Sequence, residues 1–163
     1  MTATEQLLAR NEAYVESFAD RGLAAAPAMK VAIVTCMDAR LDPARALGFS
    51  PGEAHVIRNA GGVVTDDVIR SLSISQHELG TEEIVVLHHS ACGMQTFTDE
   101  EFIAAREADT GQRPAWRPMA FADLEQDVRD SVARLRDSPF IPRKGSVRGF
   151  VYEVETGRVR EVT

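Results

Sequence analysis

The feature that most constrains the fold is a short apolar run, VAIVT at residues 31 to 35, which has a counterpart in IVVL at residues 84 to 87. Runs of this length without polar alternation are typical of strands covered on both faces, as in parallel sheets. Between them, residues 66 to 79 carry apolar positions at near-helical spacing, and Gly80 follows. Two buried strands joined through a helix form a right-handed parallel crossover, which predicts an α/β fold.

The remaining segments fit this prediction. Residues 4 to 19 have the pattern of an amphipathic helix that must dock on this subunit or on a neighbouring one. The other expected elements are a strand at 55 to 59, a helix from Thr98 with a capping box completed by Glu101, a helix from 121 to 138 stopped by Pro139, and a closing β-hairpin around the turn at 155 to 158. Residues 42 to 54 are expected to be a Pro/Gly-containing connection.

Length and composition limit the class of protein. A chain of 163 residues is most simply one domain, here residues 1 to 163 with an N-terminal helical arm at 1 to 28. The net charge of -7 argues against a nucleic-acid partner, and the apolar stretches are too short for a membrane span. The acidic, amphipathic N-terminus does not resemble a secretory signal, so we expect a cytoplasmic protein.

Reactive side chains follow two of the expected strands. The sequence TCMDAR places Cys36, Asp38 and Arg40 at alternate positions directly after the first apolar run, and HHSACGM, residues 88 to 94, follows the later one. Ligands in open parallel sheets bind beyond the carboxyl ends of the strands. We therefore expect both clusters to face one crevice.

Within these clusters, Cys36, His89 and Cys92 supply two thiolates and one imidazole, a ligand set that suits zinc. Three protein ligands leave a fourth position, for which Asp38 is the nearby candidate. Taken singly, either cysteine could be an ordinary buried residue, and His88 is a rival ligand. Strand alternation lets only one of the two histidines face the ion, and His89 lies nearer the turn.

Arg40 can hold Asp38 in a bidentate pair and so keep the carboxylate off the metal. Asp38 paired with Arg40 would leave the metal open to water, whereas Asp38 on the metal would close it. Because two thiolates donate more charge than histidines, we expect the acidity of a bound water to be less lowered than by three imidazoles and the activity optimum to lie on the alkaline side.

Three segments together resemble the signatures of β-class carbonic anhydrases: CMDAR at 36 to 40, VIRNAGG at 56 to 62 and HSACG at 89 to 93. The resemblance runs from about Val31 to the terminal hairpin. It implies a carbonate dehydratase, a lyase that reversibly hydrates carbon dioxide to bicarbonate and a proton by attack of zinc-bound hydroxide. One zinc ion per chain is the implied cofactor.

Carried over to this sequence, the resemblance makes Cys36, His89 and Cys92 the zinc ligands and Asp38 with Arg40 the catalytic gating dyad, with Asp38 on zinc only in a closed state. It also implies a mostly parallel sheet with an antiparallel edge strand, flanked by helices. The expected assembly is a homodimer, often paired into a tetramer, whose N-terminal helix packs on the partner subunit.

The segment after the second strand is the expected anion or substrate loop, comprising Asn59, Ala60 and Gly61, together with Gly93. Its backbone N–H groups could form a nest for an anion, or its glycines could simply supply the positive φ angles of a tight turn. Both interpretations stay open from the sequence.

The chain departs from the family pattern at two places. His88 replaces the usual glycine before the ligand histidine, and His55 stands where an aromatic residue is common. Ile57 replaces the histidine that binds bicarbonate in some members, which favours the small, always-open subgroup. His55, His77 and His88 are candidate proton shuttles, and His88 is more simply a structural, hydrogen-bonded residue.

Three other functions remain as alternatives. Carbon disulfide or carbonyl sulfide hydrolysis is known on the scaffold that the sequence resembles, and the zinc motif alone does not separate it from carbon dioxide hydration. A non-catalytic zinc-binding regulatory protein would use Asp38 as a permanent fourth ligand, although Arg40 competes for that carboxylate. A redox protein would instead join Cys36 and Cys92 in a disulfide.

Overall fold

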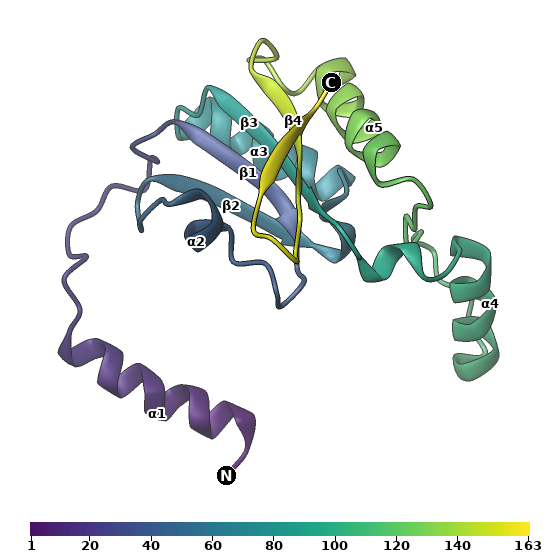
Figure 1. Ribbon diagram of the computed structural model, residues 1–163, viewed down its shortest axis with the longest axis horizontal. Coiled ribbons are helices and arrows are strands. Elements are labelled where there is room, and N and C mark those ends of the chain that lie inside the picture. Colours follow the sequence, from purple (N-terminus) through teal and green to yellow (C-terminus); the bar gives the residue numbers. More distant parts are fainter.

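The computed structural model describes residues 1–163 and contains one mixed sheet (Figure 1). Its strands are β1 (Val31–Cys36), β2 (Ala54–Asn59), β3 (Glu83–His89), β4 (Val147–Tyr152) and β5 (Val159–Val162). They are ordered β2-β1-β3-β4-β5. All neighbouring pairs are parallel except β4 and β5, which are antiparallel. This confirms the predicted α/β fold, with its mostly parallel sheet and antiparallel edge.

Five helices are present in all. They are α1 (Ala3–Glu16), α2 (Pro43–Leu47), α3 (Asp66–Glu78), α4 (Asp99–Thr110) and α5 (Leu124–Asp137), with short 3-10 turns η1 (Ala60–Gly62) and η2 (Gly93–Gln95). Helices α3 and α5 flank the sheet as expected. Thr65 caps α3 through its side chain, and Thr98 and Glu101 form the predicted capping box of α4. Such caps satisfy the backbone N–H groups left free in a first helical turn.

The sheet is covered unequally on its two faces. The larger core packs α3 and α5 against one face through Val68, Leu72 and Leu135, which meet strand residues such as Val34 and Val86. The smaller core on the other face lies under α2 and the loops around it. Burial of β1 and β3 on both sides explains why their sequences are continuous apolar runs.

The connection expected at residues 42 to 54 contains α2, which the sequence analysis missed. Asp42 accepts hydrogen bonds from the first-turn amides, Pro43 occupies the first turn, and Gly48 ends the helix with φ of 76°. These are ordinary start and stop signals. With five residues, the helix was too short to show a periodic apolar pattern.

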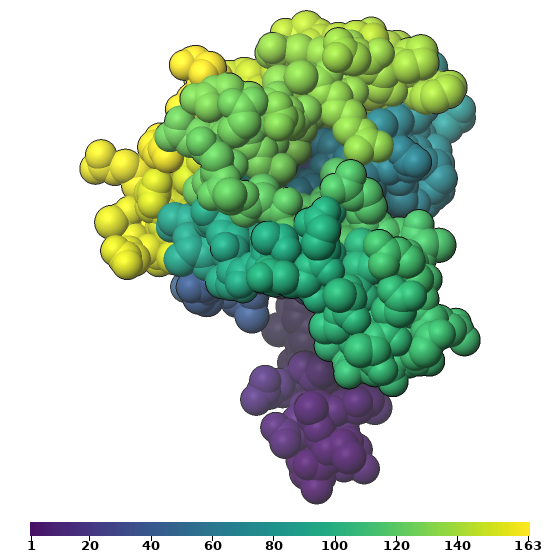
Figure 2. Space-filling model, turned by 90° about the vertical axis from the view of Figure 1, so that its right-hand side faces the viewer, coloured from purple at the N-terminus to yellow at the C-terminus, as the bar shows by residue number.

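The N-terminal segment stands apart from the sheet. Helix α1 has no buried residue, and every residue before Pro27 is exposed. Figure 2 shows α1, in purple, projecting below the rest of the molecule. None of the helices combines the length and the apolar character needed to cross a bilayer.

Candidate active site

The strand order brings the reactive ends of β1, β2 and β3 to one edge of the sheet. Cys36 at the end of β1 is in register with Asn59 at the end of β2. On the other side of β1, Thr35 is in register with Leu87 of β3, so that His89 and the turn after it lie at the same edge. The predicted meeting of the two sequence clusters is therefore observed.

Cys36, His89 and Cys92 form a compact group of donor atoms at this edge. Their ligand atoms all lie within 4.8 Å of one another, and the three residues are only 4%, 0% and 3% exposed. Both cysteines are free thiols rather than a disulfide. The pairing that a redox protein would need is therefore not formed.

The tautomer of His89 follows from its neighbours. Its Nδ1 lies 2.9 Å from the carbonyl oxygen of Ser90, which can only accept a hydrogen bond, so Nδ1 carries the proton. The lone pair of Nε2 then faces the thiols, and this buried nitrogen has no hydrogen-bond partner. An orphaned imidazole nitrogen beside two thiols fits a zinc ion, whose usual ligands are Cys sulfur and His nitrogen.

The pKa values of the two thiols are shifted in opposite directions. Hydrogen bonding with Cys92, partly opposed by burial, lowers the pKa of Cys36 to about 4. The same interaction and burial raise the pKa of Cys92 above its ordinary value. Burial has the largest single effect on the pKa of His89 and lowers it, but the interaction with Cys36, the hydrogen bond to Ser90 O and the negative charges of Cys36 and Asp38 together outweigh burial and raise the pKa. The Cys36 thiolate is thus a buried negative charge that a bound cation would neutralise.

Asp38 and Arg40 form the predicted bidentate pair. Arg40 Nε donates to Asp38 Oδ1 at 2.9 Å, and Nη2 donates to Oδ2 at 2.7 Å. These hydrogen bonds hold the pKa of the Asp38 carboxyl well below its usual range and raise the pKa of Arg40. Asp38 Oδ2 lies 3.7 Å from His89 Nε2, so the anchored carboxylate borders the donor cluster.

Arg58 also belongs to this region, although no site role for it was expected from the sequence. Its guanidinium donates to the carbonyl oxygens of Cys36, Asp38 and Leu41. The partners lie 17 to 22 positions earlier in the chain and are backbone atoms. No side-chain pattern in the sequence signals such contacts; the one hint was the place of Arg58 at a strand end.

The expected anion loop packs directly against β1. Gly61 and Gly62 have φ of 86° and 71°, which confirms the need for positive φ angles. A Cβ on Gly62 would lie 2.8 Å from the carbonyl carbon of Thr35. Asn59 Nδ2 donates to Val63 O and stabilises the turn. The loop thereby lines the site, as Gly93 does at the start of η2.

A cavity of about 600 Å³ opens beside the donor cluster. Cys36, Asp38 and Cys92 contribute to one part of its wall. The rest is largely apolar and includes Met94, Phe97, Phe102, Trp116 and Met119. The cavity therefore combines charged and metal-binding groups with a largely apolar wall.

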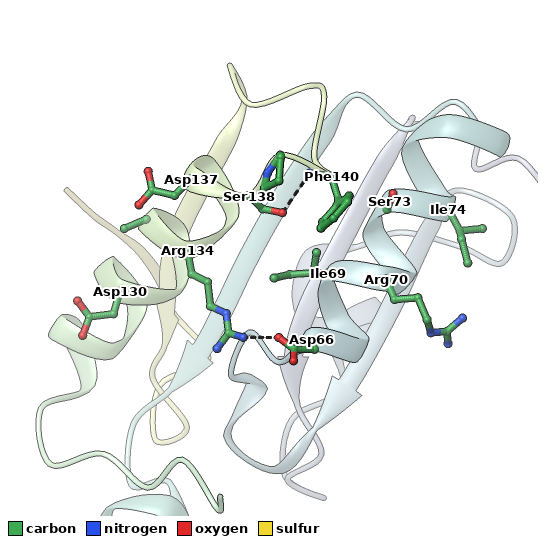
Figure 3. A pocket seen from close by; sticks show the side chains of 12 residues that line it. Asp66, Ile69, Arg70, Ser73, Ile74, Asp130, Arg134, Asp137, Ser138 and Phe140 are labelled. Atoms are coloured by element: carbon green, nitrogen blue, oxygen red, sulfur yellow. Dashed lines mark hydrogen bonds and ion pairs between the residues drawn. The ribbon is translucent and has the colours of Figure 1, made fainter. Parts of the chain in front are cut away.

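A second cavity, of about 930 Å³, lies between α3 and α5 (Figure 3). Ile69 and Phe140 point into it, and an ion pair of 2.6 Å joins Arg134 to Asp66 at one side. Neither a cysteine nor a histidine lines it. It offers none of the predicted donor set and lies outside the candidate site.

The other histidines lie away from the first cavity. His88 is fully buried, with Nε2 3.1 Å from Gly62 O and Nδ1 3.1 Å from an Asp127 carboxylate oxygen, which supports the structural interpretation. His55 contacts Ser75 and Ala25. His77 sits in the last turn of α3. None of the three lines the cavity, so the geometry assigns none of them as a proton shuttle.

Comparison with known proteins agrees with this geometry. A family model described as Carbonic anhydrase matches residues 31–116. Beta-carbonic anhydrase 1 of Mycobacterium tuberculosis is 54% identical over 163 residues, covering 100% of this chain and 99% of the relative. The crystal structure of carbonic anhydrase from Streptococcus mutans gives a TM-score of 0.95 at 49% identity and covers 100% of this chain and 99% of that one. A carbon disulfide hydrolase of Acidianus sp. is 39% identical over 153 residues, 79% of this chain and 75% of the relative.

The fold and the site define an α/β enzyme with a Cys-His-Cys group that could hold a metal ion at the carboxyl edge of its sheet. The chain belongs to the β-carbonic anhydrase family, whose members are carbonate dehydratases, a class of lyases. The resemblance and the enzyme class expected from the sequence are thus confirmed.

Proposed function

We propose that this chain reversibly hydrates carbon dioxide to bicarbonate and a proton, with one Zn²⁺ per chain held by Cys36, His89 and Cys92. The observation that carries the proposal is the buried, unpartnered Nε2 of His89 beside two thiols and the Arg40-anchored Asp38 carboxylate. Zinc in such a site acts as a Lewis acid that makes water nucleophilic near neutral pH.

The residues of the dyad have separate tasks in this proposal. Asp38, ionised because of Arg40, accepts a hydrogen bond from the reacting water and orients it at the edge of the donor cluster. Arg40 keeps the carboxylate in this position and away from the metal. Because the pair is formed in this structure, it supports an open site of the kind expected from Ile57.

The cavity and the neighbouring loop suit the substrate and the product. Carbon dioxide is small and uncharged, so the apolar wall formed by side chains such as Phe97 and Trp116 can admit it at little desolvation cost. Bicarbonate is an anion, and we propose that backbone N–H groups of Asn59, Ala60, Gly61 and Gly93, which line the same cavity, favour it.

Carbon disulfide hydrolysis is the second candidate. A relative named carbon disulfide hydrolase is 39% identical to this chain, and a solved structure of a carbon disulfide hydrolase has a similar fold, with a TM-score of 0.76 at 32% identity. The same donors and the same apolar wall would accept a softer, larger substrate. A regulatory zinc protein is less well supported, since Asp38 is engaged by Arg40 rather than directed at the cluster as a fourth ligand.

We further propose that the protein is a cytoplasmic homodimer that can pair into a tetramer. Each subunit is one domain, residues 1 to 163, and its N-terminal arm, residues 1 to 28, packs α1 on the partner subunit. Support for the dimer comes from the wholly exposed α1. A reducing compartment suits two free thiols that must bind a metal. Carbon dioxide and bicarbonate are the proposed small-molecule partners, with no nucleic acid and no membrane involved.

Stopped-flow carbon dioxide hydration against pH, on protein whose zinc content is determined in the same sample, tests the proposed reaction. We expect one zinc per chain and a rate that rises from neutral to alkaline pH. One zinc without hydration at any pH would contradict the proposal. Release of hydrogen sulfide from carbon disulfide by that sample would then support the second candidate.

A further inference from the structure

The loop that follows β1 carries Asp38 and Arg40, the two residues of the proposed dyad, but has little regular secondary structure of its own. Between Cys36 and Pro43 the chain forms turns rather than a helix or strand. Inside the loop, Leu41 N donates to Asp38 O at 3.1 Å, and the backbone N–H and guanidinium of Arg40 donate to the Asp38 carboxylate. Contacts from outside the loop add to this support and hold its backbone against the neighbouring strands.

Arg58 supplies that outside support. From the end of β2, its Nε donates to Cys36 O at 2.8 Å, and its Nη2 donates to Asp38 O at 2.9 Å and Leu41 O at 2.8 Å. The hydrogen bonds of this guanidinium go to the last residue of β1 and to two residues of the loop, and the side chain forms no ion pair with a carboxylate. A guanidinium that serves only three carbonyls of one turn acts as a clamp on the backbone.

We infer that Arg58 is a positioning residue that sets Cys36 and Asp38 relative to each other. The inference rests on the proposed function for its catalytic consequence, but the clamp itself is a property of the protein. Only an arginine offers several N–H donors in one rigid plane, whereas the ammonium of lysine is a single point charge on a flexible stem. Binding all three carbonyl oxygens thus requires the planar set of N–H donors of a guanidinium as well as its positive charge.

The role of Arg58 differs from that of Arg40. Arg40 fixes the carboxylate group of Asp38 through its side chain and also donates to Ala91 O at 2.9 Å, next to Cys92. Arg58 fixes the backbone from which both Cys36 and Asp38 project. Together the two arginines join β2, the loop after β1 and the turn after β3, which are the three segments that form the site.

The test uses two variants of the full-length, zinc-loaded protein. Arg58→Met removes all donors and keeps most of the stem, and Arg58→Lys keeps the charge but loses the fork. For both we expect faster hydrogen exchange at the amides of residues 37 to 41, altered absorption bands after cobalt replaces zinc, and a fall in kcat of about 10- to 100-fold with a smaller change in KM.

Arg136→Met is the matched control. Arg136 Nη2 also donates to a backbone carbonyl, Val147 O at 2.7 Å, but at the start of β4 and so at the opposite edge of the sheet. This variant is expected to lose thermal stability while its loop exchange, cobalt spectrum and kcat stay as in the unaltered protein. A general loss of stability is thereby separated from misplacement of the site.

The outcomes separate this inference from the proposed function. Unchanged loop exchange and an unchanged cobalt spectrum in Arg58→Met would overturn the inference, as would wild-type behaviour of Arg58→Lys if Arg58→Met fails to fold. If the unaltered protein hydrates no carbon dioxide, the proposed function fails. Changed exchange and spectra in the Arg58 variants would still establish the clamp in that case.

Discussion

Asp38 is held from two sides, because Arg40 pairs with its carboxylate and Arg58 with its backbone carbonyl. Neither contact uses a sulfur or nitrogen donor atom of the cluster, so the carboxylate is held in place without occupying a metal-ligand atom. This separation between holding the metal and orienting water yields a direct prediction for a substitution at Asp38.

Asp38→Ala should retain one zinc per chain and lose about 10- to 100-fold in kcat, because it removes an orienting group and no donor atom. Metal analysis and stopped-flow hydration on one sample check both parts. Cys92→Ala is the contrasting variant and should lose metal and activity together. Loss of zinc from Asp38→Ala would show that the carboxylate is a ligand and that the open-site assignment is wrong.

Gly62 marks the closest approach of the anion loop to β1. A Cβ there would lie 2.8 Å from Thr35 C and 2.9 Å from Cys36 N, at a φ of 71°. We expect Gly62→Ala to lower the free energy of unfolding by about 1–3 kcal/mol, since both backbone strain and overpacking act there. Urea denaturation measures the change. Gly145→Ala, with open space around it and no positive φ, is the control and should be nearly neutral.

The sequence predicted some residues of the candidate site and not others. Cys36 and His89 could be predicted because they end recognisable strands, Cys92 because it lies in the turn after β3, and parallel strands bring their carboxyl ends together. Arg58 could not, since its partners are carbonyl oxygens whose positions depend on the folded loop. A side chain that binds backbone leaves no complementary residue in the sequence.

Helices and strands with a clear local sequence pattern were as predictable as the three residues of the Cys-His-Cys group. The apolar runs of β1 and β3 and the capping box of α4 lie as expected. Helix α2 was missed, and its length of five residues spans too little of a helical repeat for periodicity to show. Sequence patterns thus located the elements that carry the site better than the short segment connecting them.

The capping box of α4 makes a pH-dependent prediction. Hydrogen bonds from the backbone N–H and the hydroxyl of Thr98 lower the pKa of Glu101 below its ordinary 4.5. A lowered pKa in the folded state means that the ionised carboxylate stabilises the fold above 4.5, and that this stabilisation is lost as the pH falls through the folded-state pKa.

NMR titration of the Glu101 side-chain carboxyl should therefore give a midpoint below 4.5. Thr98→Ala removes the hydroxyl but leaves the backbone N–H, so the pKa should rise only part of the way to its ordinary value. A midpoint at or above 4.5 in the unaltered protein would mean that the capping box does not persist in solution.

Helix α5 packs so closely on β4 that a glycine is required between them. A Cβ on Gly149 would collide with the side chain of Val128 and lie 3.1 Å from Cγ2 of Val132. Gly149→Ala should cost about 1–3 kcal/mol of unfolding free energy through overpacking. Combining it with Val128→Ala, which makes room, should cost less than the sum of the two single changes, and simple additivity would contradict the close packing.

The molecule as a whole divides into a packed α/β body and an arm that touches little of it. The sheet, α3 and α5 hold the main core, whereas α1 leaves Leu7, Leu8, Tyr14 and Val15 more than half exposed (Figures 1 and 2). An isolated helix of 14 residues is marginal in water, and burial of a leucine contributes about 1.5–3 kcal/mol. The arm thus needs a partner surface, which we propose is a second copy of the chain.

Replacing both Leu7 and Leu8 by serine should shift the dimer toward monomer, because it removes two apolar anchors from each α1 while leaving the body of the domain intact. Sedimentation velocity over a range of protein concentrations measures the shift. Gln6→Ser with Asn11→Ser, also exposed positions on the same helix, is the matched control and should leave association nearly unchanged. A dimer of undiminished affinity in the leucine variant would mean that the chains associate through the body, not through α1.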